Sequence, residues 1–281
     1  MLSRNSQRVF SNERLDPRLR AGLVGHWIGG GSGNTWVDRS GYGNHGALTN
    51  GPLWTLGEGG KRNALQFDGV NDYVAVPSSP NTESVTISAW VKTPSLAGRR
   101  TLVSLSDSGI SLIPTLKIKT GSGGTNVVAV VSQGLFQAQT KNNAITTGIW
   151  LHLTYVKRGN GATHEIYVDG IEQELNSNTS STYVTTADTR AIGRRNGANG
   201  QYSLGILDDV RIYNRALSAA EVALLATPSF SPVTPRRFFF GKRSGAAPGT
   251  LIKTWNGLAN ANVKTVNGLD RGLVKSRNGL S

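Results

Sequence analysis

Apolar and polar residues alternate along several short segments of this chain, and the pattern predicts β-strands. Residues 85–92 carry Val, Ile, Ala and Val at every second position, with Thr, Ser, Trp and Lys between them. A period of two sends one set toward a core and the other toward the opposite face or a second layer. Further runs predict strands over residues 22–27, 64–67, 73–76, 150–157, 164–168 and 205–213.

Turn residues separate these runs. Asp169-Gly170 stands between two apolar segments and is a strong hairpin signal. In residues 38–46 the glycines supply positive φ at little steric cost, and Asp38 and Ser40 can accept hydrogen bonds from nearby backbone amides. Strands joined by such turns favour antiparallel pairing.

One helix is expected after the last strand. Ser218 and Glu221 have the spacing of a capping box, which predicts a helix ending near Ala226. The sequence therefore predicts an all-β, antiparallel sandwich with a single short C-terminal helix.

The order of several sequence phrases carries a family resemblance. The phrases are residues 38–46, 67–69 with 72–74, 85–92, 166–170 and 207–217. In this order they resemble the laminin-G-like, concanavalin A-like jelly rolls, and the resemblance covers roughly residues 21–227. It implies a jelly-roll β-sandwich, a fold that serves binding, structural and catalytic proteins alike.

Composition agrees with a turn-rich β-protein. The chain has 281 residues, 35 of them Gly, and 7% aromatic residues, which suits one large sandwich with appendages better than a helical bundle. It has no Cys, so disulfides, thiolate metal sites and Cys nucleophiles are excluded. No continuous apolar segment predicts a Sec signal or a membrane span.

Positive charge is concentrated at the two ends. The formal net charge is +13; residues 1–20 hold five Arg against Glu13 and Asp16, and residues 228–281 hold nine Lys or Arg against Asp270. The part between them is almost neutral. This division predicts a basic N-terminal arm and a basic tail that meet an acidic or assembling partner.

The C-terminal part differs from the sandwich. Residues 228–251 are Pro-rich and predict a linker with a basic and aromatic anchor, and residues 252–281 repeat with a period of 11. Asn-Gly in each repeat favours a β-tail with turns over a helix, and stacking on another chain is expected, with a homo-oligomer, for example a trimer, as the outcome. The predicted anchoring residues are Arg236, Arg237, Phe238, Phe239, Phe240, Lys253, Trp255, Lys264 and Lys275.

Carboxylates define a hypothetical calcium site. The resemblance implies a structural Ca²⁺ held by oxygens of two turns, and hard oxygen ligands suit this ion. The matching residues are Asp68, Asp72, Asp208 and Asp209, with Asp38 as an addition. The alternative is that Asp68 and Asp72 cap a tight turn and that Asp208 pairs with Arg211 or Arg190.

Aromatic residues in predicted loops define a hypothetical glycan surface. Sugar sites combine aromatic rings with a few polar groups, and the alternative is that these rings close the ends of the sandwich. The predicted residues are Trp36, Tyr42, Trp54, Tyr183, Asn196 and Tyr202, with Asn199 and Gln201 as further polar groups.

Catalysis and nucleic-acid binding find less support. Glucanases of this architecture carry two carboxylates as E-x-D-x-E on one strand, and no such phrase occurs here. The basic residues around Phe238–Phe240 could contact phosphates and stack on bases, but Lys at one fixed place of each repeat favours a solvated architectural role.

Three functions follow from these patterns. The first is a non-catalytic structural or adhesive protein on an assembly, most concretely a bacteriophage capsid-decoration or tail-fibre component at the virion surface, anchored by its basic ends. The second is a secreted, calcium-supported carbohydrate-binding module. The third is a glycoside hydrolase with an unfamiliar acid pair.

Overall fold

A computed structural model gives the fold. It describes residues 16–31, 33–60, 63–77, 83–105, 115–120, 126–132, 135–141, 143–179, 190–195, 201–228, 254–255 and 258–259. The chain forms two compact units, residues 1–231 and residues 232–281.

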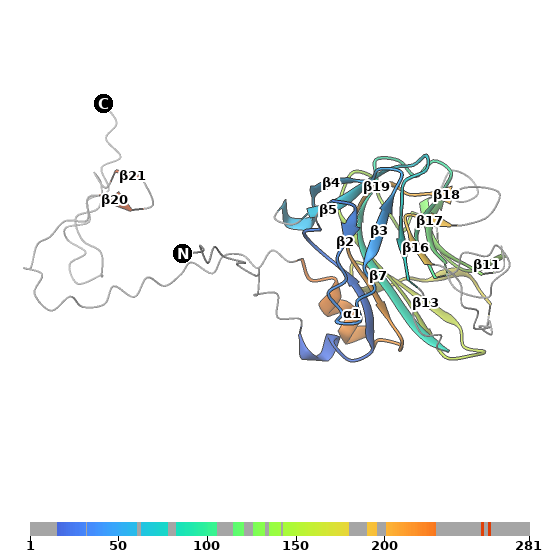
Figure 1. The fold of residues 1–281 in the computed structure, drawn as a ribbon. Coiled ribbons are helices and arrows are strands. Elements are labelled where there is room, and N and C mark those ends of the chain that lie inside the picture. The colour runs from blue at the N-terminus through green and yellow to red at the C-terminus, as the bar shows by residue number, and fades with distance from the viewer. Residues whose placement is uncertain are drawn as a thin grey trace, which may run out of the picture. The chain divides into compact units, whose positions relative to one another are not determined.

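The first unit is a sandwich of two antiparallel sheets (Figure 1). One sheet is called sheet A. Its strand order is β14 (Ile171–Glu172), β13 (His164–Val168), β12 (Leu151–Arg158), β7 (Ser84–Lys92), β19 (Leu204–Tyr213), β5 (Asn63–Asp68) and β4 (Leu53–Leu56). An eighth strand, β1 (Leu23–Trp27), lies outside this order and pairs with β19. The other, sheet B, has the order β15 (Leu175–Asn178), β11 (Leu135–Thr140), β10 (Asn126–Ser132), β9 (Thr115–Thr120), β8 (Arg99–Ser104), β16 (Arg190–Ile192), β6 (Tyr73–Val76), β3 (Gly46–Thr49), β2 (Thr35–Trp36). The predicted all-β sandwich of the jelly-roll class is confirmed.

Short elements complete this unit. They are the hairpin of β17 (Arg194–Arg195) and β18 (Gln201–Tyr202), two 3-10 turns, η1 (Pro17–Leu19) and η2 (Glu58–Gly60), and the helix α1 (Ala219–Leu225). Ser218 and Glu221 form the predicted capping box at the start of α1, so this prediction is confirmed.

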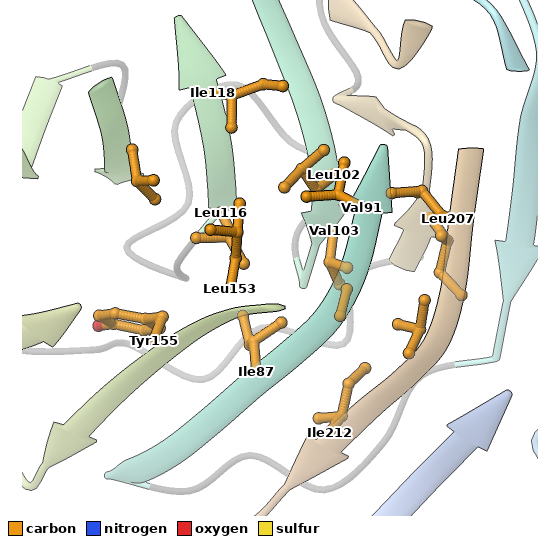
Figure 2. Packing of buried hydrophobic residues seen from close by; sticks show 14 of the residues in the cluster. Ile87, Val91, Leu102, Val103, Leu116, Ile118, Leu153, Tyr155, Leu207 and Ile212 are labelled. Carbon is orange, nitrogen blue, oxygen red and sulfur yellow. The ribbon is translucent and has the colours of Figure 1, made fainter. Parts of the chain in front are cut away.

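The core lies between the sheets. In β7 the alternate residues Ile87 and Val91 enter it, and from sheet B Leu102, Leu116 and Ile118 meet them (Figure 2). The alternation of apolar residues along residues 85–92 thus identifies the side of β7 that faces the core, as predicted.

The outer face of sheet A is covered in part by a second layer. Leu19 and Leu23 and the α1 residues Val222 and Leu225 form a buried cluster with Tyr167 of β13 and its neighbours. This layer explains why β7 and β12 are buried on both faces, although their sequence alternates.

A β-bulge interrupts β19. Its register against β7 shifts between Asp208 and Arg211, and Asp209 has a φ of 46°. The strict alternation expected of the adjacent pair Asp208 and Asp209 is therefore broken at this point.

In the second unit the structure describes one strand pair, β20 (Thr254–Trp255) with β21 (Leu258–Ala259), which is antiparallel. The other residues of the predicted 11-residue repeats lie outside the described residues. Within the described part of the chain, no helix is both long enough and apolar enough to span a membrane.

Candidate functional site

Asp38 organises the first glycine-rich turn. Its Oδ1 accepts hydrogen bonds from the backbone amides of His26 (2.9 Å) and Ser40 (2.8 Å), and its Oδ2 accepts from Ser40 Oγ (2.7 Å) and the Asn44 amide (2.9 Å). Four donors therefore engage this carboxylate. It ties β1 to the turn and explains why Asp stands here.

Asp68 and Asp72 close the turn between β5 and β6. Asp68 Oδ1 accepts from the amides of Val70 (2.8 Å) and Asn71 (3.2 Å), and Asp72 Oδ2 accepts from the Asp68 amide (3.0 Å). Burial raises the pKa of Asp72, and the neighbouring Asp68 carboxylate adds to this shift. The alternative that the pair caps a tight turn is confirmed.

Asp208 and Asp209 have separate roles at the bulge. Asp208 Oδ2 accepts from the amide of Glu58 (3.1 Å). Asp209 forms a bidentate ion pair with Arg211, with distances of 2.6 and 2.7 Å, and lies 2.8 Å from Nε2 of His26. Burial acts to raise the pKa of Asp209, but the Arg211 charge and the His26 contact hold it well below its usual value.

These five aspartates do not form one ligand cluster. Among the described residues, no group of three or more His, Cys, Asp or Glu side chains could hold a metal ion. Asp38 and Asp209 are instead engaged by backbone amides and by Arg211, respectively. Arg211 pairs with Asp209 and not with Asp208; the pairing of Asp208 with Arg190 stays a prediction.

Calcium stays a prediction, and the acidic pair at the turn after β5 is the place left for it. An ion bound there only by the native state would raise the melting temperature, by an amount equivalent to about 2.7 kcal/mol at a hundredfold excess over its dissociation constant. Thermal unfolding with added Ca²⁺ and with EDTA, at fixed ionic strength, measures this. Identical melting temperatures would contradict calcium binding.

Three of the predicted glycan residues lie near β2 and β4. Trp36 is fully buried in the core, and Trp54, half-buried, meets it edge to face at a centroid distance of 6.4 Å. Trp54 Nε1 also donates to the Gly33 carbonyl (3.3 Å). Tyr42 is 64% exposed on the turn that Asp38 organises. The two tryptophans thus close the sandwich, and only Tyr42 presents an open ring.

Tyr202 lies in a different place, on the β17–β18 hairpin that follows β16 (Figure 1). It is half-buried and pairs across the hairpin with Arg194, whose guanidinium lies 3.8 Å from the ring centroid of Tyr73. Next to it, Gln201 Oε1 accepts a hydrogen bond from Nζ of Lys117 on β9. Tyr183, Asn196 and Asn199 lie outside the described residues.

The hairpin thus takes part in two contacts with sheet B: Arg194 with Tyr73, and Gln201 with Lys117. We call the group Tyr73, Lys117, Arg194, Gln201 and Tyr202 the hairpin site. Sequence reasoning found Tyr202 and Gln201 but missed Tyr73, Lys117 and Arg194. The one sequence signal for Lys117 is that it alternates with the apolar residues Leu116 and Ile118, which places its side chain on the face of the strand opposite the core.

Of the predicted anchoring residues, the structure describes Trp255 alone, in β20. The others, Arg236, Arg237, Phe238, Phe239, Phe240, Lys253, Lys264 and Lys275, lie outside the described residues. Anchoring stays a prediction.

The fold and the hairpin site define a β-sandwich of the lectin-like jelly-roll class, in which polar and aromatic groups lie on one outer sheet face. The chain belongs to the concanavalin A-like lectin/glucanases superfamily, whose Laminin_G_3 family profile matches residues 68–223. A comparison with curated proteins gives no match.

Solved structures share this fold at low sequence identity. Domain 4 of AbnA, an extracellular arabinanase of glycoside hydrolase family 43 from Geobacillus stearothermophilus in complex with arabinotriose, is 21% identical with a TM-score of 0.57, over 73% of this chain and 98% of that one. The binding domain of Paraclostridial Mosquitocidal Protein 1 is 20% identical (TM-score 0.56; 74% and 52%). The receptor-binding domain of botulinum neurotoxin mosaic serotype C/D is 16% identical (TM-score 0.54; 74% and 51%). This chain spans about half of each toxin domain.

Proposed function

We propose that the sandwich is a non-catalytic carbohydrate-binding module that acts outside the cell, with the hairpin site as its sugar-binding surface. The observation that carries the proposal is the contact of the Arg194 guanidinium with the ring of Tyr73, next to half-buried Tyr202, which pairs with Arg194 across the hairpin. A ring offers an apolar face to a pyranose or furanose, and polar neighbours orient its hydroxyls.

The comparisons support a binding role by analogy of fold. The arabinanase domain was solved with arabinotriose, and the other two structures are a binding domain of a mosquitocidal protein and a receptor-binding domain of a neurotoxin. We therefore choose arabinotriose as the first neutral probe for this chain.

The arrangement of carboxylates supports a non-catalytic role. Asp208 and Asp209 are buried, and Asp209 is held by Arg211. Glu165 accepts hydrogen bonds from Arg158 and from the hydroxyl of Tyr167 (2.8 Å). A retaining glycosidase needs an acid and a nucleophile about 5 Å apart that both face the substrate, and neither Asp209 nor Glu165 is placed to act so.

Replacing Tyr202 with alanine is expected to weaken sugar binding at least about fivefold, because truncating a central aromatic contact typically costs about 1 kcal/mol or more. Isothermal titration calorimetry of the full chain with arabinotriose, after a glycan array to rank neutral and acidic sugars, measures this. The melting temperature should change little.

Tyr42→Ala is the matched control, because it removes an exposed tyrosine at another place and should leave affinity unchanged. The opposite result, loss with Tyr42→Ala and none with Tyr202→Ala, would move the site to the turn of residues 38–46. No binding to any sugar on the array would contradict the proposal.

The assembly function stays a prediction for the second unit and the basic N-terminal arm. The three structures described above are a domain of a secreted enzyme and two toxin domains, so a virion role gains no support from them.

A further inference from the structure

Cationic side chains face one another across two strands beside the hairpin site. In the β8–β9 ladder, Arg99 is the direct partner of Lys119, and Thr101 is the direct partner of Lys117. Leu116 and Ile118 enter the core, so Lys117 and Lys119 lie on the outer face of sheet B. Cationic side chains therefore gather on one face of these two strands.

Two polar residues on this outer face of sheet B, Thr101 and Lys117, are buried. Thr101 is fully buried, and its Oγ1 has no hydrogen-bond partner in the described part of the chain. Lys117 is 1% exposed and donates to the neutral side-chain oxygen of Gln201. A buried hydroxyl without a partner is destabilising, and a ligand oxygen that accepts its hydrogen bond would remove this penalty.

Three further cationic side chains near Thr101 and Lys117 are exposed to solvent at least in part. Arg99 is exposed, and Lys119 and Arg195 are half-buried. Burial lowers the pKa of Lys117 to about 7, and the charges of Arg195 and Arg99 add to this shift. Burial, and then the charge of Arg99, also lowers the pKa of Lys119 and of Arg195. The positive charges of these side chains therefore lie close enough to influence one another.

We infer that this face binds an acidic sugar: Lys117 and Thr101 hold a carboxylate or sulfate of the glycan, with Arg99, Lys119 and Arg195 around it. The inference rests on the proposed function and names its ligand class. An anionic group would accept a hydrogen bond from the Thr101 hydroxyl and form charge-assisted bonds with the lysines and arginines around it. The rings of the hairpin site would then carry the neighbouring sugar.

Binding of tri-galacturonic acid to the full chain tests this inference. Its methyl ester keeps the sugar backbone without the charges and should bind at least about tenfold more weakly. A sulfated oligosaccharide in the same titration separates sulfate from carboxylate recognition.

Thr101→Val is the sharpest variant, because it keeps the side-chain shape and leaves the net charge at +13. We expect about a tenfold loss of affinity for the acidic sugar, since a hydrogen bond to a charged group is lost. Binding through the basic ends of the chain would not respond to this change. An unchanged affinity in a variant with an unchanged melting temperature would overturn the inference.

Lys117→Met and Lys141→Met form a pair with equal loss of charge. Lys141 lies exposed at the end of β11 and pairs with Glu174. Only Lys117→Met should weaken binding, by about tenfold at pH 6. Equal losses in both variants would indicate general electrostatic attraction and overturn the inference.

The affinity should also depend on pH. Lys117 faces Arg99 on β8, Arg195 on β17, the neutral Gln201 on β18 and Ala129 on β10. Its ammonium is charged below about pH 7 and neutral above it, so acidic-sugar affinity should fall as the pH rises through 7. Lys117→Met should remove this dependence.

The outcomes separate the two proposals. If arabinotriose binds as well as tri-galacturonic acid, the inference fails and the carbohydrate-binding function stands. If neither sugar binds, the function itself fails. Single-stranded DNA that competes equally with the acidic sugar would indicate a general polyanion site and overturn the inference.

Discussion

Replacing Gly205 with alanine is expected to destabilise the sandwich by about 3 kcal/mol or more, which corresponds to a fall in melting temperature of about 6–12 °C for a domain of this size. Gly205 lies in the central strand β19 with a φ of +113°, and a Cβ there would come within 2.3 Å of the Lys92 carbonyl oxygen and 2.8 Å of Thr93 Cα. Both neighbours are backbone atoms of β7 and the segment after it, so they cannot move aside without disturbing the sheet.

Gly159→Ala separates the cost of the positive φ from the cost of the steric clash. Gly159 has nearly the same φ, +114°, but nothing lies within 4 Å of the added Cβ. It should therefore show only the backbone cost of about 1–2 kcal/mol. Thermal or urea unfolding followed by circular dichroism measures both variants. Equal losses would show that the close approach of β19 to β7 contributes nothing.

Replacing Asp209 with asparagine is expected to cost about 3 kcal/mol, because Arg211 then remains as a buried charge without its ionic partner. The side chain of Arg211 is 12% exposed and that of Asp209 6%. Asparagine keeps the shape and tolerates the positive φ of this position, so the loss reports the charge. Urea unfolding at pH 7 gives the change in the free energy of unfolding.

Glu174→Gln is the control, since it breaks an ion pair with Lys141 in which both side chains are largely exposed, and it should leave stability unchanged. The pH dependence has a definite sign. The pKa of Asp209 is held below its unfolded value, so its stabilising effect is complete above about pH 4 and is lost as the pH falls toward the folded pKa. The deficit of Asp209→Asn should shrink in acid; a deficit that grows there would contradict the assignment.

Local patterns were sufficient for the strands that alternate strongly. Residues 85–92 lie in β7, whose bounds in the structure are Ser84–Lys92, and Ser218 with Glu221 predicted the start of α1. Both signals are local: a period of two fixes which face is apolar, and a capping box acts within one turn of helix.

The candidate site was only partly predictable. Tyr202 and Gln201 stood out as aromatic and polar residues near predicted loops, but Trp36 has the same appearance in sequence and is buried. Whether a ring closes the core or faces outward depends on which sheet lies over it, and a single strand does not contain that information. The contacts of His26 met the same limit, because this residue of β1 meets Asp38 and Asp209, which lie elsewhere in the chain.

By itself, the sequence of this protein determined the strands that alternate strongly, the start of its helix and, through the order of its phrases, its superfamily. The tertiary structure alone decided that Thr101 lies opposite Lys117, that Lys117 contacts Gln201, and that β19 bulges at Asp209. The physical reason is that strand register and sheet order are set by contacts between residues far apart in the chain, whereas alternation and capping are set by neighbours.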